Sequence, residues 1–290
     1  MGKKAKICIC TGILLFLAGA AAFVCGFALL DFKPENLNTH TLRSETYAAQ
    51  EDFDTVRLQF PDADIRVEFS ETAENISLSY PEKYDRKDKA VTETKITAEG
   101  KTLCVKQTAL WYKMLFNVSF TRGSAVLALP ANKVYHLELD ADNGKIELPA
   151  GAYGNVSLET DNGAIRVNGI EAQTLRIETD NGAISAENVA AETIGLETDN
   201  GKIIMNNVTA NAVSASTDNG DIELTRLTAN DIRLSTANGD VAGTVCGKTS
   251  EYKIDASTHN GRCNLQPSES GEKFLRAKSN NGNIEIAFTE

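Results

Sequence analysis

One acidic residue recurs at a fixed spacing in the second half of the chain. An aspartate stands two positions before the glycine of five successive Asn-Gly pairs: Asp142, Asp161, Asp180, Asp199 and Asp218. Stacked about 5 Å apart, these carboxylates would repel one another, and bound calcium would relieve that repulsion. Alternatively, each aspartate caps its own turn by accepting backbone N–H hydrogen bonds. The unit lacks the glycine-rich loop of calcium-binding solenoids, so we expect capping, with no metal and no cofactor.

Sets of catalytic residues are missing from the sequence. The three histidines are scattered, and no Ser/His/Asp set, zinc-ligand spacing, phosphate loop or dinucleotide fingerprint is present. Solenoid enzymes that cleave polysaccharides carry carboxylates where the repeat is broken, whereas here the carboxylates belong to the repeat. We therefore expect a protein that is not an enzyme. The alternative is a carbohydrate-acting solenoid enzyme of the cell envelope, which a cleft with two or three non-repeating carboxylates would favour.

Two further groups could form a bond or a contact surface. Cys246 and Cys263 stand at inward positions of consecutive units, either as small core residues or as partners in a disulfide across adjacent coils. The apolar tract 110–116 contains the only tryptophan of the chain. Its residues Trp111, Tyr112 and Phe116 either cover an open end of the fold or contact a partner or the outer membrane face.

The elements that position these residues are short strands in a repeated unit. One Asn-Gly pair recurs at the same position of eight units, at intervals of 19 residues and finally of 22 and 21: Asn143-Gly144, Asn162-Gly163, Asn181-Gly182, Asn200-Gly201, Asn219-Gly220, Asn238-Gly239, Asn260-Gly261 and Asn281-Gly282. Apolar and polar residues alternate on both sides of each pair, as Leu175, Ile177 and Ile184 illustrate. This alternation is typical of half-buried strands.

Two architectures fit this pattern. Asn-Gly between alternating strands is the strongest short-range signal for a hairpin and would give an antiparallel meander. Alternatively, each unit is one coil of a solenoid, with like residues stacked in parallel sheets. Near-identical columns favour stacking, and a long meander would leave open edges. We predict an all-β fold with a parallel β-solenoid at residues 51–290, comprising an atypical first part (51–130) and eight Asn-Gly repeats (131–290).

A family resemblance rests on these same residues. The run AVLALP at 125–130, followed by LELDADNGKI at 137–146 and its repeats, resembles the bacterial "putative adhesin" family of β-strand-repeat domains of unknown function. The resemblance covers residues 51–290 and implies a surface domain, often with one N-terminal membrane segment and common in Gram-positive bacteria. It carries no catalytic motif. We therefore expect an adhesin, or an envelope component that senses or scaffolds, with a surface protein or glycan as its partner.

The N-terminal segment predicts a membrane anchor. Residues 7–30 carry no charge and are rich in Leu, Ala and Phe, and about 20 apolar residues span a bilayer as a helix. Residues 1–6 contain three lysines, which predicts a cytoplasmic tail. A cleaved signal peptide is the rival interpretation, because small residues at 18–22 fit a cleavage site. We expect a single-pass transmembrane helix at 7–30, a polar stalk at 31–50 and an extracellular position for residues 31–290.

The charge balance excludes one class of partner. The 29 basic residues include Lys3, Lys4 and Lys6, which leaves 26 basic residues beyond Leu30 against all 40 acidic ones. Such a negative surface keeps a protein soluble but repels phosphate backbones. Nucleic acid is therefore not expected as a partner.

Overall fold

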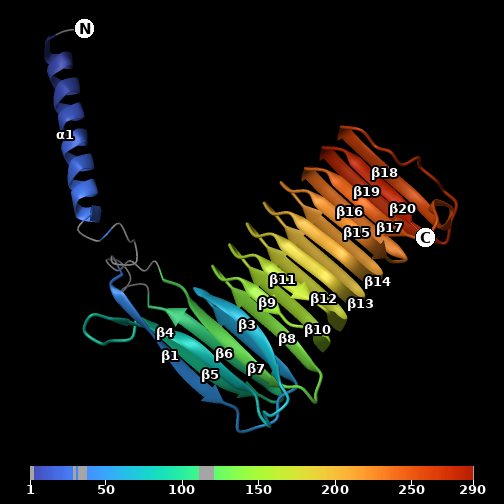
Figure 1. Ribbon diagram of the computed structural model, residues 1–290, viewed down its shortest axis with the longest axis horizontal. Helices are drawn as coiled ribbons and strands as arrows, with labels where there is room; N and C mark the ends of the chain where they lie inside the picture. The colour runs from blue at the N-terminus through green and yellow to red at the C-terminus, as the bar shows by residue number, and fades with distance from the viewer. Residues whose placement is uncertain (1–2, 29–30, 32–37, 111–120, 290) are drawn as a thin grey trace.

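The computed structural model describes residues 3–28, 31, 38–110 and 121–289 and shows a long stack of short strands (Figure 1). Helix α1 (Lys3–Ala28) precedes the strands. The strands are β1 (His40–Ala48), β2 (Thr55–Phe60), β3 (Ala63–Ser70), β4 (Ser77–Asp85), β5 (Thr92–Glu99), β6 (Thr102–Ala109), β7 (Gly123–Pro130), β8 (Tyr135–Ala141), β9 (Ile146–Leu148), β10 (Gly151–Thr160), β11 (Ile165–Asn168), β12 (Ile170–Thr179), β13 (Ile184–Thr198), β14 (Ile203–Thr217), β15 (Ile222–Thr228), β16 (Asp231–Asn238), β17 (Val241–Cys246), β18 (Tyr252–Asn260), β19 (Lys273–Asn281) and β20 (Ile284–Thr289).

The repeats stack as parallel coils. β12 pairs in parallel with β10, which places Leu175 beside Val156, and β13 pairs with β12, which places Ile194 beside Leu175. Each of the eight repeated Asn-Gly pairs is a corner between two sheet faces. The corner glycines do not adopt the positive φ of a two-residue hairpin turn. The all-β prediction with parallel, solenoid-like strands is therefore confirmed, and the meander is excluded.

Alternation of side chains builds the core. In β13, Ile184, Ala186 and Leu196 point inward and are buried, whereas Ser185 and Glu187 point outward. The same columns are buried in the neighbouring coils, so one continuous apolar core runs along the stack. Each fully buried Leu or Ile side chain contributes about 1.5–3 kcal/mol. The outer surface of the stack is therefore polar.

The order of the coils in space differs from their order in the chain at the N-terminal end. β2 pairs in parallel with both β6 and β8, and β3 pairs with both β7 and β9. The first coil in the sequence therefore lies between the second coil and the first Asn-Gly repeat. Figure 1 shows this exchange as the blue strand β3 among green strands.

The C-terminal end shows the same exchange. β19 pairs with β16 on one side and with β18 on the other, and β20 pairs with β17. The last coil in the sequence is therefore inserted before the coil that precedes it. On β18, the backbone of Ile254 exchanges two hydrogen bonds with Ser268, at 2.8 and 3.0 Å. This contact partly covers the edge strand of the stack.

An antiparallel cap covers the N-terminal end of the solenoid. β5 pairs with β6, β4 with β7, and β1 with β4, all antiparallel. β1 includes residues 40–48 of the segment expected to be an irregular stalk. That expectation is wrong for these residues, because every one of them pairs with β4.

The N-terminal helix α1 covers most of the segment expected to span a membrane. Within the part of the chain that the structure describes, no helix is both long enough and apolar enough to cross a bilayer. The transmembrane helix predicted at residues 7–30 is therefore not supported by the structure.

Candidate functional site

The repeated aspartates lie one above another at the corner of the coils. Asp161, Asp180, Asp199 and Asp218 are exposed, and Asp142 is half-buried. Burial raises the pKa of Asp142, and the negative charges of Asp161, Asp140 and Asp62 add to this effect. Among the described residues, no group of three or more His, Cys, Asp or Glu side chains is arranged to hold a metal ion. The structure therefore does not support calcium in this column.

The asparagines beside these aspartates form a ladder of side-chain hydrogen bonds. Asn162 Nδ2 donates to Asn143 Oδ1 at 2.9 Å, and Asn181 donates to Asn162 at the same distance. The ladder continues through Asn200, Asn219, Asn238, Asn281 and Asn260. The sequence indicated the asparagine column but not the ladder, which uses each amide to bind the next coil.

The threonine three positions before each glycine fixes the corner. Thr179 Oγ1 donates to the carbonyl of Gly163 in the coil below, at 3.1 Å, and accepts from the N–H of Gly182, also at 3.1 Å. The hydroxyl is buried, with Thr179 only 2% exposed. A Cβ on Gly182 would lie 1.7 Å from the Gly163 oxygen. The backbones of neighbouring coils therefore approach so closely that this position requires glycine. The threonine hydroxyls and the backbone groups they bind have a structural role.

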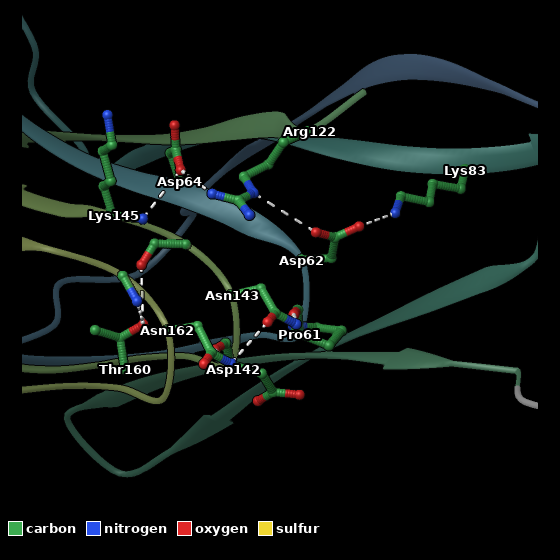
Figure 2. A network of polar contacts seen from close by, with 12 residues as sticks. Pro61, Asp62, Asp64, Lys83, Arg122, Asp142, Asn143, Lys145, Thr160 and Asn162 are labelled. Carbon is green, nitrogen blue, oxygen red and sulfur yellow. Dashed lines mark hydrogen bonds and ion pairs between the residues drawn. The ribbon is translucent and has the colours of Figure 1, made fainter. Parts of the chain in front are cut away.

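The first Asn-Gly corner meets the first coil of the chain, formed by β2 and β3, in a network of polar contacts (Figure 2). Asn143 Nδ2 donates to the carbonyl of Pro61 at 3.3 Å, which extends the ladder to the β2–β3 corner. Asp62 pairs with the buried Lys83 and with Arg122. The exchange of coil order thus brings residues of the cap, the first coil and the first repeat together.

An outward groove of about 740 Å³ crosses β2, β8, β10 and β12. Its charged side chains are both acidic and basic. Arg57 Nε donates to Glu138 Oε2 at 2.5 Å. Arg176 occupies the same outward column on β12, two strands beyond Glu138. The groove is the candidate contact surface, because its charged side chains stay about half exposed to solvent even where they pair between coils, as Arg57 and Glu138 do.

The carboxylates of the groove are close enough to influence one another. Burial raises the pKa of Asp140, and the negative charge of Asp161 adds to this, while a hydrogen bond from Gln59 opposes it. Burial also raises the pKa of Glu159, followed by the charges of Asp140 and Glu178. Both carboxyls therefore accept protons more readily than free ones do.

A β-bulge shapes the same groove. The backbone N–H of Asn155 donates to His136 Nδ1 at 2.9 Å, and the register between β8 and β10 shifts beside it. A Cβ on Gly154 would lie 2.5 Å from the His136 ring, so glycine lets the imidazole lie flat against the strand. Bulges of this kind commonly adjust the direction of side chains near functional surfaces.

The structure describes one of the two other predicted groups. Trp111, Tyr112 and Phe116 lie outside the described residues. Cys246 and Cys263 are free. β20 lies between their coils, with Ile284 beside Cys263 and Thr289 beside Cys246. Two coil steps of about 4.8 Å exceed the Cα separation of about 7 Å that a disulfide allows. The disulfide alternative is therefore wrong, because it assumed that chain order is stacking order, and the alternative of two small, partly buried residues remains.

Comparison with known proteins gives four findings. The sequence model of the family "Toastrack DUF4097" matches residues 53–288. No curated protein matches the chain. A crystal structure of a "putative adhesin" from Bacteroides fragilis is 14% identical with a TM-score of 0.53, covering 85% of this chain and 97% of that one. A "putative lipid binding protein" from Parabacteroides distasonis is also 14% identical, with a TM-score of 0.47, covering 84% and 97%.

Proposed function

The chain belongs to the Toastrack DUF4097 family, as its resemblance to adhesin-type β-strand repeats predicted, and we propose that it is a non-catalytic interaction protein of the cell surface. The partner is a surface protein or a glycan. The solved relative from Bacteroides fragilis, with its "putative adhesin" name, is consistent with such a role. Nucleic acid is not a partner, because the chain beyond Leu30 carries an excess of acidic residues.

The observation that carries this proposal is the open, charged groove on the outer sheet. At the corners, the Asn and Thr side chains bind neighbouring coils. On the outer face of β2, β8, β10 and β12, the charged side chains of Arg57, Glu138, Glu159 and Arg176 line an open groove. An elongated polar surface on a rigid scaffold suits the binding of an extended partner.

Attachment to the membrane is a separate part of the proposal. It rests on the sequence of residues 7–30, which are uncharged and follow a lysine-rich N-terminus. Residues 31–290 would then lie outside the cell. Protease added to intact, wall-stripped cells should digest the solenoid, and the mature protein should sediment with membranes. Recovery of most of it as a soluble, cleaved species would instead indicate a signal peptide.

Photo-crosslinking on intact cells tests the groove as the contact surface. A photoreactive residue replaces Glu159 in one variant of the full chain and Ser235 in another. Both positions lie in one outward column, but Ser235 is on β16, away from the groove. We expect higher-mass adducts from position 159 and few from position 235. Equal adducts from both positions, or none from either, would contradict the proposal.

Charge reversal supplies a second comparison for the same experiment. Arg57→Glu and Arg176→Glu should weaken the adducts from position 159. Arg233→Glu is the matched control, because Arg233 occupies the column of Arg176 and pairs with Asp231 in its own strand. Loss of adducts in all three variants would indicate a general charge effect.

The alternative of a carbohydrate-acting enzyme has its own test. Asp140 and Glu159 are adjacent outward carboxyls in the groove, and burial raises the pKa of each. If the purified full chain released reducing ends from isolated envelope glycan, and Asp140→Asn abolished this release, catalysis would replace binding as the function.

A further inference from the structure

A second, smaller cavity lies beside the junction in Figure 2 and apart from the outer groove. It has a volume of about 230 Å³ and lies where the antiparallel cap meets the β2–β3 corner and the first Asn-Gly corner. Its polar lining includes His40 from β1, Lys83 from β4, Asp62 from the β2–β3 corner and Asp142 from the first repeat. These residues are far apart in the chain. Antiparallel pairing of β1 with β4 brings His40 near Lys83, and the exchanged coil order brings Asp62 beside the first repeat.

His40 is the unusual member of this lining. It is 7% exposed, and within the described part of the chain neither ring nitrogen has a hydrogen-bond partner. Burial lowers the pKa of His40, the positive charge of Lys83 lowers it further, and Asp85 opposes both. The ring is therefore neutral near pH 7 and offers one donor and one acceptor. Buried polar atoms without partners are rare, because their desolvation is not compensated.

Some of the charged groups around His40 have ion-pair partners. The Lys83 ammonium, 7% exposed, donates to Asp62, which also pairs with Arg122 at 3.7 Å. The Asp142 carboxylate makes no hydrogen bond or ion pair among the described residues and is half-buried. An acceptor-rich carboxylate and a neutral imidazole therefore face the same cavity.

We propose that this cavity binds one small uncharged polyhydroxyl ligand, of the size of a single sugar ring. Both ring nitrogens of His40 are shielded from solvent in this structure. A small displacement of the ring would let a ligand hydroxyl, which both donates and accepts, satisfy either nitrogen and also donate to Asp142. Pro61, Val91 and Ala109 provide apolar walls for the C–H face of the ring. An anion would be repelled by Asp142, because Lys83 is already paired with Asp62. The described residues offer no group of three metal ligands.

This site is independent of the groove, so either proposal can fail alone. Ligand-observed saturation-transfer NMR would use the full chain in a mild detergent. The probes are glucose, galactose and N-acetylglucosamine, with zinc chloride and inorganic phosphate as ionic probes. We expect at least one sugar to bind saturably with a Kd of about 1 mM or tighter. His40→Gln and Asp142→Asn should each weaken it at least tenfold.

His259→Gln is the matched control, because this exposed imidazole lies at the far end of the stack. It should leave sugar binding unchanged. The proposal is overturned if no sugar binds, if binding survives both cavity variants, or if His40-dependent binding is found only for zinc or phosphate. Should His40→Gln fail to fold, Asp142→Asn decides the question, since it keeps the size of a half-buried side chain.

Discussion

Asn281 Nδ2 lies 2.8 Å from Asn238 Oδ1, although 43 residues separate them in the chain. Asn260, which precedes Asn281 in the sequence, donates to it from the opposite side at 2.7 Å. The last coil is therefore held on both edges, and the first coil is held in the same way at the other end. Terminal repeats usually fray because they have one neighbour only. Because each is placed between two other coils, the first and last coils of the chain have two neighbours.

The buried threonine column makes a measurable contribution to stability. Thr179→Val keeps the side-chain shape but leaves the Gly163 carbonyl and the Gly182 N–H without their partner. We expect the free energy of unfolding to fall by about 1–3 kcal/mol, measured by urea denaturation. Thr209→Val on the exposed face of β14 is the control and should change stability little. Equal losses in both variants would show that the corner hydrogen bonds are unimportant.

Glycine is required at the corner but not on the sheet face. Gly182→Ala would place a methyl group 1.7 Å from the Gly163 oxygen, whereas a Cβ on Gly195 meets nothing within 4 Å. We expect Gly182→Ala to destabilise by about 1–3 kcal/mol or more, and Gly195→Ala to stabilise by about 0.4–1 kcal/mol. Thermal melts compare the two variants. A harmless Gly182→Ala would contradict the close stacking of the corners.

Much of the fold could be predicted because each coil repeats the same inward pattern. The alternation around Ile184 and Leu196 places both in the core, as observed. The parallel arrangement could be predicted from the uniform columns, because identical side chains pack most favourably when they stack on one another. The periodic part of the sequence therefore predicted periodic structure well.

The order of the end coils was not predictable from these columns. Asn238 can bind Asn260 or Asn281 with the same geometry, so the ladder does not specify which coil comes next. The only sequence signal is the change in interval from 19 to 22 and 21 residues, which allows a longer connection. The cavity at His40 was missed for a related reason, because one histidine in a polar segment carries no periodic signal.

Acidification should destabilise the cap through His40. Because its pKa is lower in the folded state than the unfolded value of about 6.5, the unfolded state binds more protons below that pH. Stability is therefore full above about pH 6.5 and falls as the pH drops toward the lowered value. Melting temperatures between about pH 7 and pH 5 should decrease in the wild type and change less in His40→Gln.

Three carboxyl groups have the opposite effect on the stability of the folded state as the pH falls. The pKa values of Asp140, Asp142 and Glu159 are raised on folding, so their ionised forms destabilise the folded state, and acid relieves this at lower pH. His259→Gln removes an exposed imidazole and is the control for the His40 effect. A wild-type profile that matches His40→Gln between pH 7 and pH 5 would rule out the role of His40.

Removal of one interior coil should leave a folded, shorter solenoid. Deleting residues 164–182 joins Gly163 to Ala183 and places Val156 beside Ile194, in the column where Leu175 now separates them. Stability in a stacked fold is roughly a sum of unit and neighbour contributions. We therefore expect a cooperative thermal melt at a moderately lower temperature.

Deletion of Ala183 alone is the matched comparison. It shifts β13 by one residue, so Ile184 and Leu196 would turn outward and Ser185 inward. The loss of two buried side chains of this size costs about 3–6 kcal/mol, more than the loss of a whole coil, whose neighbours rejoin. If the deletion of 164–182 unfolds the protein as severely as the deletion of Ala183, the coils do not behave as interchangeable units.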